Sequence, residues 1–413
     1  MAHMSHMSLT IAESDVSASE AAWKRALAEN RIEDPAAFAA FMLGKTSRTF
    51  ALNIQVLPPG LRRQILLAYL FCRMADTLED DGALEADAKI SLLHSFRRLF
   101  TPGSGDVPDR AGAGSMGWEN RLATFRARLP SEWEASERWD HLLVYHCHWI
   151  FPQLLDFRDA VIGAISKCVD EMCSGMADFT RKHSQSGSGI LTESLEDLDR
   201  YCYYVAGTVG NLLCDLFALH SPLIGKKRAQ ALRALSVSFG LGLQLTNILK
   251  DIREDGQRNV SFIPRSLLEE EGLSPSDFLS PDSGSGAARI MTRLIRKAQS
   301  HLEDALAYTC LLPRFEPRLR LFCLWPLFMA VESLVLMAAN PGGFKGQSKI
   351  KISRKQVKRI VAKTSAACWS DTWIRAMFRG SIRRLEEGLA SRAEAAPIRS
   401  LREIRVRPAG GLP

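Results

Sequence analysis

The sequence of 413 residues lacks the patterns that mark several large classes of protein. Its nine cysteines occur singly, without a Cys-x-x-Cys pair and without a secretory signal. These absences argue against a disulfide framework or a zinc site, and they favour a reducing cytoplasm. No Glu-x-x-His pair occurs either, which argues against a di-iron carboxylate bundle.

Alternating polar and apolar runs, which would indicate strands, are also missing. Segments rich in Ala, Leu, Arg and Glu, with apolar residues three or four positions apart, cover almost the whole chain instead. This pattern predicts an all-α protein, and a hydrophobic content of 46% allows a sizeable core. The first eight residues are typical of a cloning-tag remnant and are excluded from this interpretation.

No apolar stretch is expected to cross a bilayer. The nearest, Leu321 to Ala339, is interrupted by Pro326 and carries Glu332, so it predicts a buried core helix.

Three interruptions rich in Gly, Ser, Pro and Asp predict loops at Thr101 to Gly117, Ser184 to Gly189 and Ser274 to Gly286. The first contains a formal Gly-x-Gly-x-x-Gly match at Gly112 to Gly117. No strand pattern precedes this match, so it does not indicate a dinucleotide site.

Acidic residues gather in two short clusters far apart in the chain, each in a segment with a helical pattern. Side chains three or four positions apart share a helix face, so each set forms a stripe. The members are Asp76, Glu79 and Asp80 in the first cluster and Asn247, Asp251 and Asp255 in the second. Carboxylates stacked in this way repel one another unless a cation lies between them, and oxygen ligands at this density suit Mg²⁺.

The flanks of both clusters are apolar: Ile65 to Cys72 run directly into the first, and Phe239 to Leu245 into the second. A lone acidic cluster is usually a solvated helix face. A helix that is apolar on most sides is buried, however, so we expect these carboxylates to point into a cavity or cleft. Because Mg²⁺ is commonly shared with substrate phosphates, the two clusters together predict a metal–diphosphate site.

Basic and aromatic residues near the clusters suit the same chemistry. Arg48 lies among hydroxyl residues, and Arg73 lies one turn before Asp76 on the same helix face. A guanidinium matches phosphate oxygens, although a single arginine more often forms a surface ion pair. Tyr201 to Gly210 combine tyrosines with small residues. Tyrosine rings can shield a carbocation and a phenol can relay a proton, although such aromatics more often pack in the core.

Three motifs in combination resemble those of a known family, the squalene/phytoene synthases, which join two isoprenyl diphosphates head to head. They are DTLEDD at Asp76–Asp81, YCYYVAG at Tyr201–Gly207 and NILKDIREDGQRNVSFIP at Asn247–Pro264, and the resemblance extends over roughly residues 40 to 365. It implies a single-domain isoprenoid-synthase helical bundle around a central cavity. The implied organisation is a flexible segment at 1–35, a catalytic domain at 36–365 and a basic helical segment with a tail at 366–413.

The resemblance also implies a role for each candidate residue. The six cluster residues named above would bind the Mg²⁺ ions that hold two diphosphates. Tyr201 would take part in proton removal, with Arg48 and Arg73 as further catalytic residues. The expected substrate-binding residues are Ser47, Phe50, Tyr69, Gln244, Lys250, Arg258, Phe322, Cys323 and Pro326.

Within the family, the closer resemblance is to squalene synthases, because these have a basic segment similar to Gly343 to Arg354. Alone it would most simply be a solvated basic face. The resemblance implies a lid that binds the phosphates of NADPH through Lys345, Lys349, Lys351 and Arg354.

The implied reaction joins two farnesyl diphosphates through presqualene diphosphate and reduces the product to squalene. The alternative is a phytoene or dehydrosqualene synthase, which needs no reductant.

The net charge of +7 is concentrated in the last third of the chain. Eukaryotic squalene synthases end in a membrane-spanning helix, which we do not expect here. The final segment carries nine arginines: Arg375, Arg379, Arg383, Arg384, Arg392, Arg399, Arg402, Arg405 and Arg407. Such a segment favours anionic lipid, so we expect a cytoplasmic protein peripheral to the membrane. Charge alone is weak support for nucleic-acid binding, which we do not expect.

Overall fold

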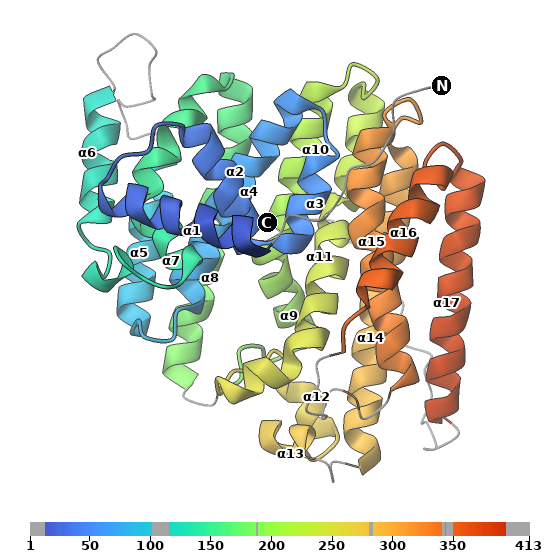
Figure 1. Ribbon diagram of the computed structural model, residues 1–413. Helices are drawn as coiled ribbons and strands as arrows, with labels where there is room; N and C mark the ends of the chain where they lie inside the picture. The colour runs from blue at the N-terminus through green and yellow to red at the C-terminus, as the bar shows by residue number, and fades with distance from the viewer. Residues whose placement is uncertain are drawn as a thin grey trace. The chain divides into compact units, whose positions relative to one another are not determined.

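The computed structural model describes residues 13–100, 115–186, 189–280, 284–340, 343 and 350–393 (Figure 1). Within these ranges the chain is helical and contains no strand; Ile190 and Ser261 form an isolated parallel bridge. The all-α prediction is therefore confirmed.

The chain divides into two compact units. Unit 1 comprises Met1–Ser184 and Leu212–Pro222, and unit 2 comprises Gln185–Asn211 and Leu223–Pro413. The helix α10 (Thr208–His220) passes from unit 2 into unit 1. Each unit is therefore built from two separate stretches of sequence. The domain limits expected at residues 35 and 365 stay predictions, and the second falls within α16 (Arg354–Ala367).

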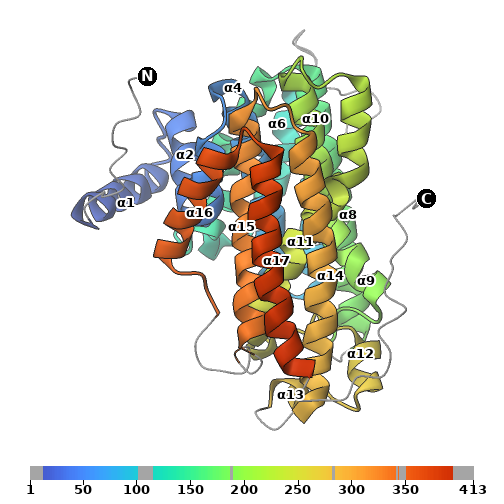
Figure 2. The same ribbon diagram turned by 90° about the vertical axis from the view of Figure 1, so that its right-hand side faces the viewer.

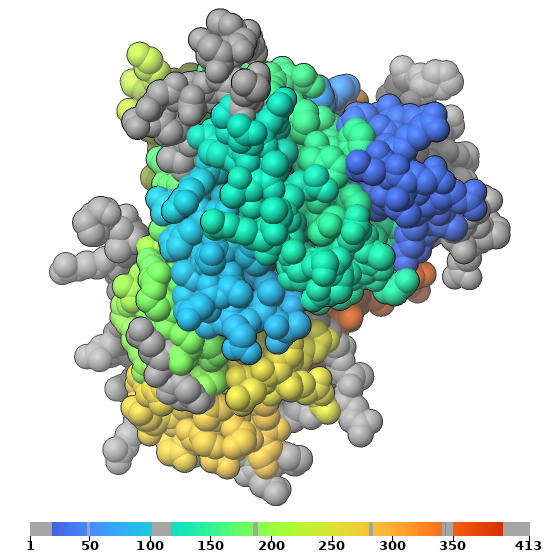
Figure 3. Space-filling model, turned by 90° about the vertical axis from the view of Figure 1, so that its left-hand side faces the viewer, coloured from blue at the N-terminus to red at the C-terminus, as the bar shows by residue number. Residues whose placement is uncertain are grey.

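Unit 1 is organised around α4 (Pro59–Asp80), which packs against neighbouring helices along its length. Phe71 on α4 contacts Phe100 and Phe151, with ring centroids 5.1 and 4.8 Å away. Figure 3 shows α5 and α6 side by side on one outer face of this unit. The other elements of unit 1 are α1 (Glu13–Ala28), α2 (Pro35–Thr46), α3 (Arg48–Gln55), α5 (Ala86–Arg97), α6 (Ser115–Arg126), η1 (Ser131–Trp133), α7 (Trp139–Tyr145), η2 (Cys147–Trp149), η3 (Phe151–Asp156) and α8 (Asp159–Ser186).

Unit 2 is a bundle of long helices, of which α14, α15 and α17 lie side by side in Figure 2. Its elements are α9 (Leu195–Cys202), the π-helix η4 (Tyr203–Gly207), α11 (Lys226–Gln257), α12 (Arg265–Glu270), α13 (Pro275–Leu279), α14 (Gly284–Leu311), α15 (Pro317–Ala339), α16 and α17 (Asp371–Ala393).

Two sets of contacts give the directions of these helices. Helices α11 and α14 run antiparallel, because Phe239 contacts Tyr308 while Gly242, further along α11, lies against Leu302. Helices α15 and α17 run parallel, because the contacts of α17 advance along α15 as its residue numbers increase. Arg320 pairs with Asp371 near the two starts, and Glu332 pairs with Arg384 further along.

Among the residues that the structure describes, two helical stretches are long and apolar enough to cross a membrane by composition, Leu195–His220 and Pro317–Ala339. The second contains the stretch expected to be a core helix. Its side chains are mostly buried against α14, α16 and α17, which confirms that expectation. Pro326 lies inside this helix.

The loop predicted from Ser274 to Gly286 is wrong in part, because it contains α13 and the start of α14. Ser274 accepts a hydrogen bond from the backbone N–H of Asp277, and the Asp277 carboxylate accepts one from the backbone N–H of Ser274. This reciprocal capping box, followed by Pro275 at the first helical position, begins a helix despite the loop-like composition. The Gly112 to Gly117 match lies mostly outside the described residues.

Close approach of η4 and α11 requires glycine. A Cβ atom built on Gly240 would lie 2.3 Å from the backbone oxygen of Ala206, so Gly240→Ala would force the two backbones apart. We expect a loss of about 1–3 kcal/mol of unfolding free energy, measured by urea denaturation followed by circular dichroism. The control is Gly380→Ala on α17, where no atom lies within 4 Å; it should be neutral or stabilising by up to about 1 kcal/mol. Equal stability of the two variants would contradict the packing described.

Candidate active site

The first acidic cluster lies at the carboxyl end of α4 in unit 1, as the helical spacing predicted. Asp76 and Glu79 are half-buried, whereas Asp80, the last residue of the helix, is exposed. Burial raises the pKa of Asp76 to about 7, with Arg73 opposing this shift and Asp80 adding to it. Burial and the neighbouring Asp80 and Asp76 raise the pKa of Glu79 well above its usual value.

Within the described part of the chain, no hydrogen bond or ion pair holds the carboxylates of Asp76 and Glu79. Their negative charge is therefore poorly compensated, and a cation bound nearby would favour the ionised forms. The oxygen donors fit Mg²⁺. The residues described contain no group of three or more His, Cys, Asp and Glu side chains already arranged around a metal position. A Mg²⁺ ion here would need further oxygen ligands, such as those of a phosphate.

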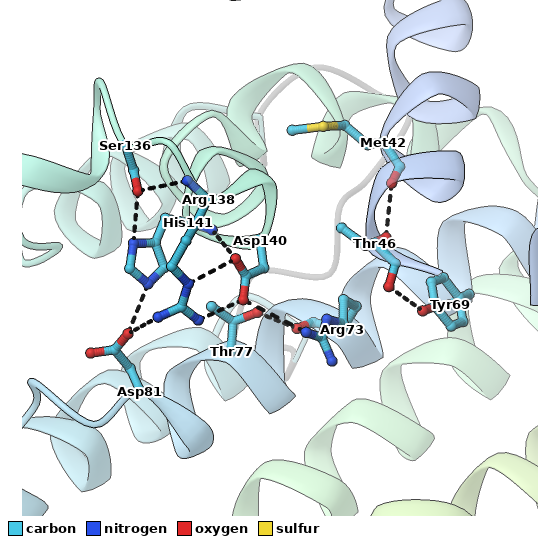
Figure 4. Close-up of polar contacts among 10 residues, drawn as sticks. All are labelled: Met42, Thr46, Tyr69, Arg73, Thr77, Asp81, Ser136, Arg138, Asp140 and His141. Carbon is cyan, nitrogen blue, oxygen red and sulfur yellow. Dashed lines mark hydrogen bonds and ion pairs between the residues drawn. The ribbon is translucent and has the colours of Figure 1, made fainter. Parts of the chain in front are cut away.

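A polar network holds the end of α4 to α7 (Figure 4). Asp81, the residue after α4, is only 2% exposed and its carboxylate lies 2.7 Å from Nε2 of His141. It also accepts a hydrogen bond from Arg138 at 2.9 Å and another from the backbone N–H of Ala83. Burial of Asp81 acts against ionisation, but these bonds and the nearby charges hold its pKa below the usual value.

The same network reaches Arg73. Arg138 donates a 2.7 Å hydrogen bond to Asp140, and Nη2 of Arg73 lies 3.6 Å from the same Asp140 oxygen. Figure 4 shows Arg73 on the far side of Asp140 from Asp81. Asp140 thus holds Arg73. Among the candidate arginines of unit 1, Arg73 is the one whose side chain is described. Sequence reasoning placed Asp81 in a motif without a role of its own, and it missed Arg138, Asp140 and His141, because about 60 residues separate α4 from α7.

Tyr69, Phe50 and Ser47 lie together where α2 meets α3. Ser47 ends α2 and begins α3, and its Oγ accepts a hydrogen bond from the backbone N–H of Phe50. The Tyr69 hydroxyl donates to the Thr46 carbonyl at 3.4 Å, and its ring centroid lies 5.6 Å from that of Phe50. Burial raises the pKa of Tyr69. Arg48 begins α3, but its side chain lies outside the described residues.

The second acidic cluster lies on α11 in unit 2, in one unbroken helix as predicted. Asn247 and Asp251 are half-buried, and Asp255 is buried. Asp255 accepts a 2.6 Å hydrogen bond from Arg258, so a predicted metal ligand and a predicted phosphate-binding residue form an ion pair. Gln244 and Lys250 are half-buried on the same helix.

The turn after α11 is fixed by the segment before α9. Asn259 has a positive φ of 58°, and Gly189 has a φ of 71°. A Cβ atom on Gly189 would lie 2.7 Å from the Asn259 backbone oxygen, so both its conformation and its contact require glycine. Ser261 then donates its backbone N–H to the Gly189 carbonyl. The end of α11 is thereby held in a defined position within unit 2.

Tyr201 is buried at the end of α9, and its ring centroid lies 4.8 Å from that of Phe262. The residues that follow it form the π-helix η4. These residues serve close helix packing, since Gly207 lies against Val237 and Leu241 of α11.

On α15, Phe322 and Cys323 are buried and Pro326 is half-buried. Lys351 and Arg354 are exposed at the start of α16. Lys345 and Lys349 lie outside the described residues.

Comparison with known sequences decides the relationship. A profile described as Squalene/phytoene synthase matches residues 43–356. The chain belongs to the squalene/phytoene synthase family.

Several family members are squalene synthases. That of Schizosaccharomyces pombe is 32% identical over 320 residues, which is 78% of this chain and 63% of that protein. That of Nicotiana benthamiana is 31% identical over 330 residues, 79% of this chain and 70% of that protein. That of Homo sapiens is 30% identical over 312 residues, 75% and 65% of the two chains. The chain thus spans 63–70% of the length of these family members.

Solved structures of the family share the fold. A ligand complex of the squalene synthase TcSQS is 22% identical, with a TM-score of 0.65 and coverage of 86% of this chain and 100% of that chain. A ligand complex of a dehydrosqualene synthase is 20% identical, with a TM-score of 0.53 and coverage of 80% and 95%. The isoprenoid-synthase helical fold expected from the resemblance is confirmed.

The buried Asp81 carboxylate predicts a specific stability effect. Asp81→Asn removes the charge that Arg138 and His141 share, and it turns one acceptor oxygen into a donor that faces other donors. We expect a loss of about 1–3 kcal/mol of unfolding free energy in urea. The matched control is Asp178→Asn, because Asp178 and its partner Arg181 are both exposed and such a pair contributes less than about 1 kcal/mol. If both variants lose the same stability, the network does not hold the end of α4.

Proposed function

We propose that this protein joins two farnesyl diphosphate molecules head to head through presqualene diphosphate and then reduces the product to squalene. The observation that carries the proposal is the half-buried pair Asp76 and Glu79, whose negative charge lacks a bonded partner one turn from Arg73. This pair belongs to a family motif in a chain 30–32% identical to the squalene synthases compared above. Carboxylates in this state suit a reaction whose substrates bring both phosphate oxygens and divalent cations.

Each acidic cluster would bind Mg²⁺ in this proposal. Asp76, Glu79 and Asp80 would supply oxygens from α4, and Asn247, Asp251 and Asp255 from α11. When bound, Mg²⁺ would neutralise the charge of the departing diphosphate and so assist formation of the allylic carbocation. Asp255 would exchange its bond with Arg258 for this role, which would free the guanidinium for a phosphate oxygen.

The side chains of the protein supply the remaining functions. Arg73, held by Asp140, would donate to diphosphate oxygens, together with Arg48, Ser47 and Lys250. Tyr69 and Phe50 present adjoining ring faces that would line the path of the hydrocarbon, as would Phe322, Cys323 and Pro326 from α15.

Tyr201 would accept or relay the proton that is lost as the cyclopropane ring closes. Its ring packs on that of Phe262 near the end of α9, and a phenol can act as a proton relay of this kind.

The reductive step would use the basic residues that precede and begin α16. Lys351 and Arg354 are exposed cations, a donor type that fits the phosphates of NADPH, and Lys345 and Lys349 would act with them. When bound, NADPH would supply the hydride that reduces the last carbocation.

Contact with a membrane surface would suit a product that is insoluble in water. We therefore propose that the protein is peripheral to a membrane, with farnesyl diphosphate taken from the aqueous side. The arginines on α17 are not equally available for this contact, since Arg384 pairs with Glu332.

Removal of either acidic cluster should abolish prenyl transfer without unfolding the protein. Asp76→Asn and Asp251→Asn should each lower the rate of diphosphate release from farnesyl diphosphate at least about 10²-fold. Each should also weaken Mg²⁺-dependent binding of farnesyl diphosphate, measured by calorimetry. Asp178→Asn, an exposed carboxylate on α8, is the control and should retain wild-type activity. Unchanged activity in both cluster variants would refute the metal assignment.

The product distinguishes a synthase that reduces its product with NADPH from one that needs no reductant. Incubation with farnesyl diphosphate and Mg²⁺ should give squalene when NADPH is present and presqualene diphosphate when it is absent, as identified by mass spectrometry. Lys351→Glu combined with Arg354→Glu should raise the KM for NADPH at least about tenfold, because two phosphate-binding charges are reversed. A hydrocarbon product that forms equally well without NADPH would instead identify a dehydrosqualene or phytoene synthase.

A further inference from the structure

Large hydrophobic side chains are exposed at one end of unit 2. Among the residues with described side chains, five large hydrophobic residues are exposed, and four of them belong to this unit. They are Leu223, Phe315, Trp369 and Trp373, with 46%, 83%, 53% and 61% of their surface exposed. Isolated exposed leucines are ordinary, but two tryptophans and a phenylalanine exposed together indicate an interaction surface.

The helix directions place these four residues at the same end of the bundle. Because α11 and α14 are antiparallel, Leu223, just before α11, lies at the end where α14 finishes and Phe315 follows. Because α15 and α17 are parallel, their starts share one end, and the start of α15 follows Phe315 directly. Trp369 and Trp373 flank the start of α17. We call these four residues the aromatic tip.

Ion pairs within unit 2 tie two segments of the aromatic tip together. Asp371, between the two tryptophans, accepts a 2.8 Å hydrogen bond from Arg314, the neighbour of Phe315. It also pairs with Arg320, whose side chain is fully buried at the start of α15. The segment that presents Phe315 is thus tied to the segment that presents Trp369 and Trp373. A surface held in this way loses little conformational entropy when it binds.

The charges around the aromatic tip are mainly positive. Exposed cations precede and begin the helices at this end: Lys226, Lys227, Arg228, Arg318 and Arg375. Glu316 is half-buried, and Asp371 is already neutralised by its two arginines. Exposed tryptophans at an end that also carries exposed lysines and arginines match the interface of an anionic bilayer, where rings enter the headgroup layer and cations meet lipid phosphates.

We propose that the aromatic tip docks unit 2 on the surface of an anionic lipid bilayer. The inference rests on the membrane contact proposed above and assigns it a surface, namely the start of α17 and its neighbours rather than the arginine-rich end of the chain. It does not depend on the prenyl-transfer chemistry, because lipid binding is measured without substrate.

The test is co-sedimentation of the full chain with phosphatidylcholine vesicles that contain phosphatidylserine, compared with pure phosphatidylcholine. The wild type should bind the anionic vesicles more tightly, and binding should weaken with salt. The triple variant Phe315→Ser, Trp369→Ser, Trp373→Ser should lose at least about tenfold in vesicle affinity. The control Leu155→Ser, an exposed hydrophobic residue of unit 1, should bind as the wild type does.

A second variant separates lipid binding from misfolding. Lys227→Glu with Arg318→Glu should lose a similar factor at low salt while retaining the circular dichroism spectrum and the rate of diphosphate release in detergent. Wild-type binding by both tip variants would overturn the proposal. If, in that case, the triple variant Arg399→Glu, Arg402→Glu, Arg405→Glu loses binding, the contact belongs to the end of the chain. A wild type that binds no vesicles but self-associates through the tip in sedimentation velocity would identify a second copy of the chain as the occupant and overturn the lipid proposal.

Discussion

Half-buried negative charge at the end of α4 is the constraint on which the candidate site depends. Desolvation raises the pKa of both Asp76 and Glu79, so each proton is given up readily only when positive charge is close. Arg73 provides part of that charge but is itself engaged by Asp140. The arrangement thus leaves a deficit of positive charge, which a bound cation would fill. The neighbouring residues matter chiefly because they keep this deficit in place.

Both acidic helices are held by residues of their own motifs that lie just beyond the end of the helix. In unit 1, Asp81 fixes the end of α4 through His141 and Arg138. In unit 2, the turn at Asn259 is fixed against Gly189, and the backbone of Ser261 pairs beside it. Carboxylates placed on a helix keep their mutual spacing, and a fixed helix end also keeps their direction. The two units therefore solve the same positioning problem with different chemistry, a buried polar network in one and a close backbone contact in the other.

Features that depend on local spacing could be predicted from the sequence, and features that depend on distant residues could not. Helices through Asp76 and Asp251 follow from apolar periodicity, and the acidic stripes follow from spacing of three or four residues. The pairing of Asp81 with His141 spans 60 residues and has no local signal. Composition also misled at α13, where a capping box outweighed a loop-like sequence. The i, i+3 spacing of Asp255 and Arg258 permits the ion pair that they form. The family resemblance instead implied that Asp255 binds Mg²⁺ and that Arg258 binds the substrate.

The path of the chain has a consequence for how the protein is made. Unit 1 is completed by Leu212–Pro222, which follow a stretch that belongs to unit 2. During synthesis, the first 184 residues therefore leave the ribosome before their last partner segment exists, while residues 185–211 wait for a bundle still to be translated. Unit 1 is complete in sequence only at Pro222, after residues 185–211 of unit 2 have been made. A chain divided at any single point would leave at least one unit without part of its own sequence.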